Sequence, residues 1–285
     1  QLFLILELIM NKTKTILITG SSKGIGFNLA NAFLKEGHTV VISGRNPDIL
    51  NAAFHTLSSR YSPTQLHAIN CDVSQHEEVQ NLWNAAIERF GKVDIWINNA
   101  GTCTAALDFI EIPSIEIQNT IQTNVIGSLL CSQVALQGML KQGFGQIFNM
   151  EGWGSKGEWS AGMTVYATSK RAVDYFSHAL HKEIRNTNIL TGTLSPGMVV
   201  TDLLVTSWEN GKVKNWKKMK RLFLFIIDPP EVVCHFLAKR ILENTKSNVR
   251  IVWMTPLRLL SRFFLPYYWK RNPIKGTVLE NLDSK

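Results

Sequence analysis

Seven short, apolar, β-rich runs alternate with longer stretches whose apolar residues have helical spacing. The seven runs lie at 15–19, 39–43, 65–70, 94–98, 145–150, 188–194 and 249–254. The helical patterns between them include 25–36, 75–90, 118–140 and 166–186. Most of the runs are apolar through much of their length, as parallel strands covered on both faces should be. The alternation predicts an α/β fold, a doubly wound parallel sheet of seven strands of the Rossmann type.

No internal repeat, low-complexity tract or Gly/Ser linker divides the 285 residues, which suffice for one large core. We expect a single domain at 11–254 that includes a substrate lid at about 202–228, followed by a C-terminal extension at 255–285. Residues 1–10 lack a basic n-region and a cleavage site and are too short to span a bilayer. We therefore interpret them as a non-native or disordered leader.

Charge is concentrated in the last quarter of the chain. Residues 208–285 hold 16 Lys and Arg against 6 Asp and Glu, whereas residues 1–207 hold 14 against 16. Bulky apolar residues are mixed with these cations and no nucleic-acid motif is present, so we expect no nucleic-acid partner. Four scattered cysteines, without metal-type spacing, predict a reduced, cytoplasmic compartment and no metal site.

A glycine-rich turn follows the first apolar run directly, in the stretch TILITGSSKGIG. Its glycines let backbone N–H groups approach a pyrophosphate, and the N-terminus of the next helix favours the negative charge. Turns also need glycine for other reasons, but the order strand, glycines, helix and strand is typical of a dinucleotide site. The contacts are expected from Gly20, Ser22, Lys23, Gly24, Ile25 and Gly26.

The second run ends in VVISGRN, which holds no acid to bond a ribose 2′-hydroxyl. Arg45 can pair bidentately with a 2′-phosphate, and Lys23 adds a second cation. The alternative is that both are ordinary surface cations. The pattern favours NADP(H) over NAD(H).

Six motifs occur in order along the chain: TGSSKGIG (19–26), CDV (71–73), NNAG (98–101), Asn124, YATSK (166–170) and SPGMVVT (195–201). Together they resemble the short-chain dehydrogenase/reductase family over residues 13–202, and more loosely to about 254. The resemblance implies that Asp72 bonds the adenine amino group, with Val73 beside the ring. It also implies a homodimer or homotetramer. The resemblance further implies that two groups of residues line the cofactor. Its ribose is lined by Asn99, Ala100 and Gly101, and its nicotinamide by Pro196, Gly197, Val199 and Thr201.

Tyr166 is the expected general acid/base. A phenol titrates near pH 10 in water, so its pKa must fall for work near neutrality. Lys170, four residues on, lies on the same helical face and supplies positive charge. The family resemblance implies that both also bind the cofactor and that Asn124 holds a water in a proton relay to the lysine. A bare Y-x-x-x-K is otherwise an ordinary surface pair.

The serine that usually assists this tyrosine is missing. Relatives read N-x-S-S after the preceding strand, whereas this chain reads Asn149-Met150-Glu151-Gly152. Aligned on the asparagine, the serine position is Gly152; aligned on the tyrosine, it is Trp153, and neither carries a hydroxyl. Loss of an oxyanion donor typically costs about 10²–10³ in rate, so an active enzyme should replace it. Ser155 is one candidate, and backbone N–H groups of the glycine loop, Ser160 and Thr164 are others. A catalytically attenuated protein is the remaining alternative.

The departure has a pattern of its own. The form F-N-M-acid-G-x-G-S, with LSPGMVVTDLL and PPEVV further on, resembles the chlorophyll b reductase branch of the family and its bacterial relatives. That branch reduces a ring formyl group with NADPH. The absence of a Ser/Arg-rich transit segment argues against a plastid protein. We expect an NADPH-dependent carbonyl reductase for a bulky lipophilic aldehyde or ketone, the alternative being a catalytically attenuated NADP-binding regulatory protein.

The lid and the tail carry the basic charge. In the lid, Trp208, Trp216, Met219 and Phe223 are interleaved with cations, which suits a large apolar substrate or, equally, a solvated basic helix. In the tail, one helical arc holds Leu257, Leu259, Leu260, Phe263 and Phe264, with Arg258 and Arg262 beside it and Pro266 ending the helix. Such a segment can lie peripherally on an anionic membrane, cover the domain's own core, or meet a subunit partner.

Overall fold

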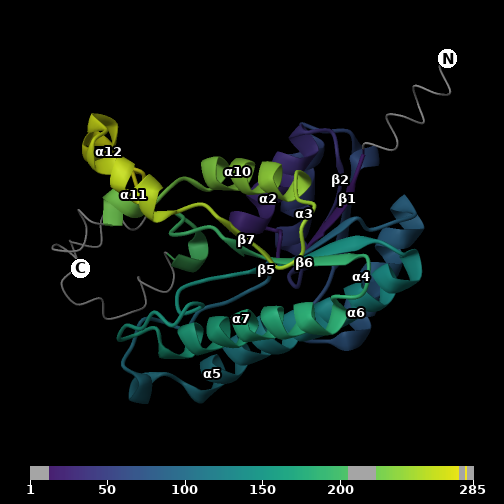
Figure 1. Ribbon diagram of the computed structural model, residues 1–285, viewed down its shortest axis with the longest axis horizontal. Helices are drawn as coiled ribbons and strands as arrows, with labels where there is room; N and C mark the ends of the chain where they lie inside the picture. Colours follow the sequence, from purple (N-terminus) through teal and green to yellow (C-terminus); the bar gives the residue numbers. More distant parts are fainter. Residues whose placement is uncertain (1–12, 205–222, 276–279, 281–285) are drawn as a thin grey trace.

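A computed structural model of the chain describes residues 13–204, 223–275 and 280. Seven parallel strands form one sheet in the order β3-β2-β1-β4-β5-β6-β7 (Figure 1). The strands are β1 Thr15–Ile18, β2 Thr39–Gly44, β3 Leu66–Asn70, β4 Ile95–Asn98, β5 Gly145–Met150, β6 Ile189–Ser195 and β7 Val249–Val252. Each coincides with one of the seven apolar runs to within one residue at its carboxyl end or lies inside it, so the predicted fold class is confirmed.

The helices form a layer on each face of the sheet. One layer contains α2 Gly24–Lys35, α3 Pro47–Ser58 and α10 Pro230–Leu242 (Figure 1). The other contains α4 His76–Phe90, α5 Ser114–Ile121, the π-helical turn η3 Gln122–Ile126, α6 Gly127–Gln142 and α7 Thr164–Ile184. Short 3₁₀ turns occur at η1 Pro63–Gln65 and η2 Phe109–Glu111, and the chain continues past β7 into α11 Pro256–Phe263 and α12 Pro266–Lys270.

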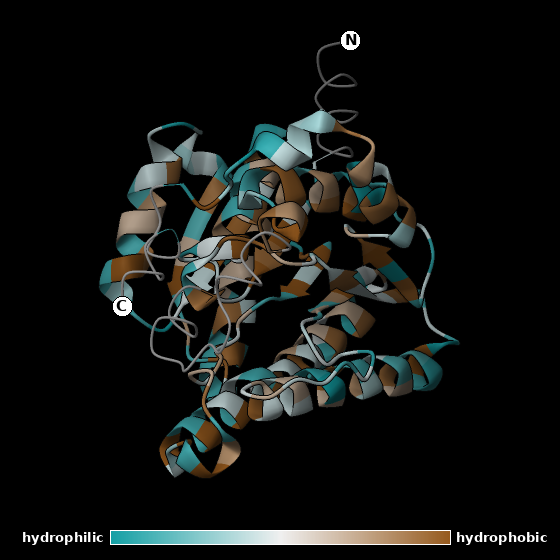
Figure 2. Cartoon of the chain, turned by 90° about the vertical axis from the view of Figure 1, so that its left-hand side faces the viewer, coloured by the Kyte–Doolittle hydropathy of each residue, from teal (hydrophilic) through white to brown (hydrophobic). Residues whose placement is uncertain are grey.

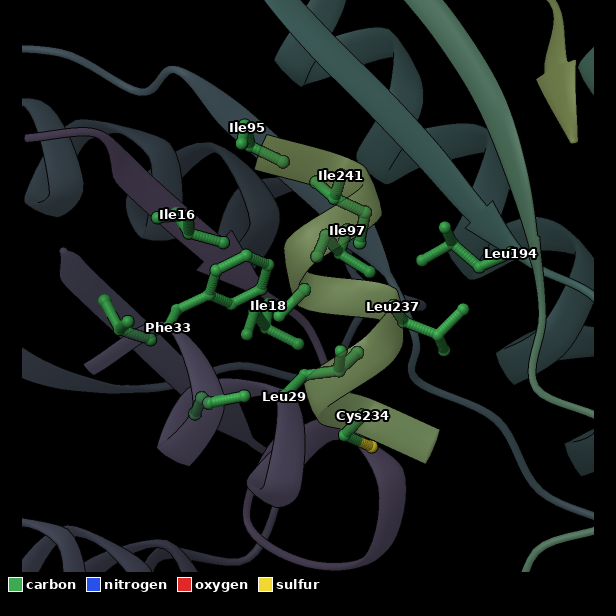
Figure 3. Packing of buried hydrophobic residues seen from close by; sticks show 14 of the residues in the cluster. Ile16, Ile18, Leu29, Phe33, Ile95, Ile97, Leu194, Cys234, Leu237 and Ile241 are labelled. Carbon is green, nitrogen blue, oxygen red and sulfur yellow. The ribbon is translucent and has the colours of Figure 1, made fainter. Parts of the chain in front are cut away.

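Two apolar cores lie between these layers and the sheet. On β1, Ile16 and Ile18 belong to one core and Leu17 to the other, because successive side chains of a strand point to opposite faces. Figure 3 shows the first core, where side chains of α2 and α10 meet the strands: Ile16, Ile18, Leu29, Phe33, Ile95, Ile97, Leu237 and Ile241. Figure 2 shows the brown, apolar strands at the centre with helices of mixed colour around them. Burial on both faces explains the continuous apolar runs.

The strand order reverses beside β1, which pairs with β2 on one side and with β4 on the other. Loops that leave the carboxyl ends of β1 and β4 therefore diverge and leave a crevice, where ligands bind in open α/β sheets. Four of the motifs, TGSSKGIG, CDV, NNAG and SPGMVVT, begin at or directly after the carboxyl ends of β1, β3, β4 and β6 at this edge.

Three of the four lid residues singled out above, Trp208, Trp216 and Met219, lie outside the described residues, as do residues 1–12. The division of the chain at residue 254 stays a prediction. Among the described helices, none is both long and apolar enough to cross a bilayer.

Candidate active site

The turn after β1 has a shape that only glycine allows. Gly20 and Gly24 have φ angles of 59° and 60°, in the left-handed region. A Cβ on Gly20 would lie 2.6 Å from Ala100 Cα, and one on Gly26 would lie 2.5 Å from Asn99 Nδ2. Helix α2 then opens with neither a side-chain cap nor an acid in its first turn. Its N-terminal N–H groups and helix dipole are left for an anion, which fits the pyrophosphate of a dinucleotide.

The segment after β4 closes onto this turn. Asn99 Nδ2 donates to the carbonyls of Thr19 and Gly20, both at 2.9 Å. Thr19 Oγ1 accepts from the N–H groups of Asn99 and Ala100 at 3.1 Å. The structure therefore brings together the glycine turn after β1 and the NNAG motif after β4, both of which are expected to bind the cofactor.

The residues expected at the cofactor's adenosine end border the same turn. Ser22 Oγ would lie 3.1 Å from a Cβ on Gly44, the last residue of β2. Arg45 follows as an exposed residue. Lys23 Nζ lies 3.6 Å from Asp202 Oδ2, and both side chains are well exposed. Arg45 thus stands exposed at the end of β2, whereas the ammonium of Lys23 has a carboxylate neighbour in the segment after β6.

The loop after β3 holds Asp72 and Val73. Asp72 Oδ1 accepts from the N–H and the hydroxyl of Ser74 at 2.9 and 2.8 Å. Val73 is buried against α6, because a Cβ on Gly127 would lie 2.6 Å from its Cγ2. Both residues have fixed positions beside the crevice.

The segment after β6 reaches the glycine turn from the opposite side. Pro196 and Gly197 follow Ser195, and Gly197 turns the chain with a φ of 69°. The buried Val199 pairs with Asp228 as an isolated bridge. Thr201 Cγ2 lies 3.6 Å from the Cβ position of Gly24, so this segment and the cradle are neighbours.

Asn124 is fully buried in the π-helical turn η3, between α5 and α6. Its Oδ1 accepts from the Thr102 N–H at 2.8 Å, and its Nδ2 donates to the Thr102 carbonyl at 2.8 Å and to Ser169 Oγ at 2.9 Å. Such π-bulges occur frequently at functional sites. A Cβ on Gly101 would lie 3.4 Å from Asn124 Oδ1 and 3.7 Å from Lys170 Nζ, so Asn124 and Lys170 converge there.

Tyr166 and Lys170 lie near the start of α7, one turn apart. Lys170 Nζ donates to the Met150 carbonyl at 3.1 Å and lies 5.8 Å from the centroid of the Tyr166 ring. Burial lowers the pKa of the Lys170 ammonium to about 8 and raises the pKa of the Tyr166 phenol well above its usual value. Cys103 raises both pKa values by a smaller amount, which indicates that its thiol is near both groups. No motif in the sequence marks this cysteine.

Gly152 explains how the tyrosine packs without a neighbouring serine. A Cβ at this position would lie 2.3 Å from Tyr166 Oη and 3.0 Å from Lys170 Cγ. Any side chain here would displace the phenol. The hydroxyl of the tyrosine thus stands against the bare backbone of Gly152.

Ser155 is buried, at 2% exposure, and its hydroxyl is engaged within the loop. Ser155 Oγ accepts from the Gly152 N–H at 3.1 Å and donates to the Lys170 carbonyl at 3.4 Å. Gly154 has a φ of 95°, in the left-handed region. Its backbone packs against α7, since a Cβ there would lie 2.4 Å from Ala167 Cβ. These bonds fix the loop between β5 and α7.

The other candidate hydroxyls lie elsewhere. Ser160 and Thr164 line a hollow together with Thr168 and Arg171. Helical periodicity puts residues 164, 168 and 171 on the face of α7 opposite Tyr166. Neither hydroxyl is therefore arranged to assist the phenol.

Glu151 is a buried carboxylate directly before Gly152. Arg250 donates to it bidentately, Nε to Oε1 at 2.9 Å and Nη2 to Oε2 at 2.7 Å, and Thr193 Oγ1 donates at 2.8 Å. Burial opposes its ionisation, but these hydrogen bonds outweigh burial and lower the carboxyl pKa. The acid of the motif N-M-E-G was the only sequence signal for this group, because Arg250 lies 99 residues away. Within the described ranges, no cluster of His, Cys, Asp or Glu has the arrangement of a metal site.

A Rossmann sheet whose fifth strand leads to a tyrosine and a lysine one helical turn apart is the arrangement of the short-chain dehydrogenases, oxidoreductases that act on CH–OH and C=O groups. The family model described as short chain dehydrogenase matches residues 14–212, and the chain belongs to this family.

Among curated proteins, it is 33% identical over 263 residues to a probable chlorophyll(ide) b reductase of Arabidopsis thaliana, described as chloroplastic. The match covers 87% of this chain and 52% of that protein, so the chain spans about half the length of this relative. A second chloroplastic chlorophyll(ide) b reductase, from Oryza sativa subsp. japonica, is 32% identical over 87% of this chain and 74% of its own. Among solved structures, the 3-ketoacyl-(acyl-carrier-protein) reductase of Brucella melitensis complexed with NADH matches with a TM-score of 0.73. That match is 23% identical and covers 84% of this chain and 96% of the other, which shows the shared fold.

Proposed function

We propose that this protein is an NADPH-dependent reductase of aldehydes or ketones that acts on a bulky lipophilic substrate. The observation that carries the proposal is the convergence of Lys170 and Asn124 around Gly101, with the Tyr166 ring 5.8 Å from Lys170 Nζ, beside the glycine cradle after β1. A ring formyl group is the first substrate class to test, because two similar proteins are named chlorophyll(ide) b reductases. Substrate identity and reaction direction are part of the proposal.

The bound cofactor would supply the hydride. Tyr166 would then donate its proton to the carbonyl oxygen as negative charge builds there. Burial raises the pKa of this phenol, contrary to the fall expected from the sequence, so the proton stays on the phenol until the carbonyl oxygen takes it. Lys170 would stabilise the phenolate that remains, and its own lowered pKa lets it pass a proton onward near pH 8.

The preference for NADPH rests on the end of β2. Arg45 is exposed there, no acid is present, and Lys23 stands on the neighbouring turn. We expect Arg45→Ala to weaken NADPH binding about tenfold or more and to leave NADH binding unchanged, because one charge-assisted pair to the 2′-phosphate is lost. Fluorescence titration with both cofactors measures this. Equal affinity of the wild type for NADPH and NADH would contradict the preference.

For the group that assists Tyr166 we propose a change of role for Ser155. Its hydroxyl is held by Gly152 and the Lys170 carbonyl, which favours a positioning role in the loop over direct contact with the substrate. The Gly152 N–H is taken by the same hydroxyl, and the Gly154 N–H by Glu158 Oε2 at 3.2 Å, so the backbone alternative is also weakened. Tyr166 is then the principal donor to the carbonyl oxygen.

The second candidate function, a catalytically attenuated NADP-binding regulator, is favoured by this same shortage of donors. NADPH oxidation with a panel of lipophilic aldehydes and ketones, a ring-formyl pigment among them, tests the reductase directly. Cofactor binding without turnover of any panel member would support the regulator. Turnover abolished by Tyr166→Phe would support the reductase.

The assembly and compartment complete the proposal. We propose a homodimer or homotetramer in the cytoplasm, to be tested by sedimentation equilibrium and by localisation of the tagged protein. Two similar proteins are described as chloroplastic. A plastid location of this protein would contradict the proposed cytoplasmic location.

A further inference from the structure

The two C-terminal helices, α11 and α12, present an exposed apolar surface, which we call the apolar tip. Its members are large side chains at least 48% exposed, namely Leu257, Leu260, Phe263, Phe264, Leu265, Tyr267 and Trp269. Phe264 and Leu257 are 78% and 76% exposed. In Figure 1 these helices stand at one end of the molecule, beyond the edge of the sheet. A contiguous patch of this kind marks an interaction site on a folded protein.

The arginines, not the leucines, attach these helices to the domain. Arg262 is 0% exposed; it donates to the carboxylate of Asp228 and to the Phe225 carbonyl at 2.8 Å. Arg271 donates to Asp228 Oδ1 at 2.7 Å and to the Ile227 carbonyl at 2.6 Å. The ordinary amphipathic arrangement is thus inverted, with cations inward and most of the apolar arc outward.

A third arginine and a tyrosine complete this attachment. Arg258 donates to the Trp253 carbonyl at 2.6 Å and stacks over the Trp253 ring at 3.8 Å. The Tyr268 ring lies between the guanidinium groups of Arg262 and Arg271, at 4.6 and 4.4 Å. Because polar and cation–π contacts hold the helices, the apolar tip is not needed to cover the domain's own core.

The charge around the tip points to one kind of occupant. Residues 255–275 contain five Lys and Arg and no Asp or Glu. Of these, Lys270 and Lys275 are exposed beside the tip. Trp and Tyr side chains with an apolar body and a polar edge favour the membrane–water interface, and nearby cations attract anionic headgroups. A second copy of the chain would bring two cationic tips together, which like-charge repulsion opposes.

We propose that the apolar tip inserts into the interfacial layer of an anionic lipid bilayer. Binding would hold the crevice of the sheet close to the membrane, because Asp228 also ties the tip to the segment after β6. The Asp228 N–H donates to the Met198 carbonyl at 3.1 Å, and its carbonyl accepts from the Val200 N–H at 3.2 Å. Delivery of a lipophilic substrate from the bilayer rests on the proposed function, whereas bilayer binding itself does not.

The test is flotation of the full chain with vesicles of phosphatidylcholine alone and of phosphatidylcholine with about one third phosphatidylglycerol. The wild type is expected to float with the anionic vesicles and weakly with the neutral ones. The triple variant Leu257→Ser, Phe264→Ser, Trp269→Ser keeps every charge. Its affinity for the anionic vesicles should fall at least about tenfold. The double variant Lys270→Gln, Lys275→Gln should reduce the preference for anionic lipid.

A matched control changes three exposed apolar residues on η2, α6 and α7, away from α11 and α12: Ile110→Ser, Leu140→Ser and Tyr175→Ser. It should float like the wild type, and cofactor titration shows that each variant is folded. A wild type that stays with the aqueous phase, or a tip variant that floats like the wild type, would overturn the proposal. So would a tip variant that loses self-association while the wild type ignores vesicles, because the tip would then be covered by a second copy. NADPH oxidation with a water-soluble aldehyde, measured in parallel, separates failure of lipid binding from failure of the reductase.

Discussion

Two glycine-rich loops at the same edge of the sheet use glycine in opposite ways. After β1, the glycines let the backbone approach Ala100 and Asn99 while the N-terminus of α2 keeps no cap. After β5, Gly152 makes room for the hydroxyl of Tyr166, and the loop's N–H groups are bonded within the loop itself. The first loop is arranged to receive an outside anion, whereas the second is arranged to seat a side chain of its own protein. Glycine content alone therefore does not identify a ligand site; the partners of the backbone N–H groups do.

The largest expected effect tests the residue that the second loop seats. Tyr166→Phe removes the proton donor but keeps the ring, so kcat should fall by about 10³-fold or more while cofactor affinity changes little. NADPH oxidation and cofactor titration measure the two quantities. A variant that retains most of its turnover would show that the phenol is not the acid.

A single methyl group added to each loop separates their roles. Gly20→Ala forces a Cβ within 2.6 Å of Ala100 Cα at a φ of 59°, and should weaken cofactor binding about tenfold or more. Gly152→Ala places a Cβ 2.3 Å from Tyr166 Oη, and should lower kcat about 10²-fold with cofactor affinity within about threefold of the wild type.

Gly37→Ala is the control for both, because Gly37 also has a positive φ, of 84°, but its Cβ would meet nothing within 4 Å. Equal losses of cofactor affinity in Gly20→Ala and Gly152→Ala would show that the two loops do not have separate roles.

Ser155→Ala tests whether this serine positions the second loop or contacts the substrate directly. Loss of its two buried hydrogen bonds should lower the free energy of unfolding by about 1–2 kcal/mol, with a fall in kcat below about tenfold. Denaturant unfolding and steady-state kinetics measure the pair. Ser177→Ala, which also loses buried hydroxyl bonds, should match the stability loss without any change in kcat. A 10²-fold loss of kcat at unchanged stability would instead return Ser155 to the role of direct donor.

The last expected effect concerns stability alone, as a dependence on pH. Lys170 has a pKa of about 8 when folded and its ordinary value of 10.5 when unfolded. Between these pH values the unfolded chain binds more protons, so stability should rise with pH, by up to about 1.4 kcal/mol per pH unit. The difference in unfolding free energy between the wild type and Lys170→Met should therefore grow from pH 8 to 10.5 and stay flat below. Parallel curves would mean that the lysine is not desolvated.

The sequence predicted the sheet because each strand carries its own signal. Ile16, Leu17 and Ile18 are all buried, and a run that is apolar on both faces needs no distant information to be interpreted. The glycine turn and the pair Tyr166 and Lys170 were equally local. Their protonation behaviour, in contrast, depends on burial by segments far away in the chain.

Two features could not be predicted from local pattern. The arc of Leu257, Leu260 and Phe264 indicates a helix with one apolar face, and periodicity alone does not say that Arg262 will be the buried member. That outcome requires Asp228 and two carbonyls, 34 to 37 residues earlier, to be the better partners. Likewise, nothing near Glu151 announces its pairing with Arg250.

The sharing of Asp228 has a consequence for how the protein opens. One carboxylate accepts from two arginines and from the indole of Trp253 at 2.7 Å, while its backbone holds the segment after β6. If the C-terminal helices detach, the carboxylate loses two of its three donors and the carbonyls of residues 225–227 lose their arginine donors. Residues 223–228 and 255–275 therefore behave as one cooperative unit that protects or releases its amide protons together. Residues 223–228, which hold the segment after β6, and the C-terminal helices α11 and α12 then unfold locally in a single step.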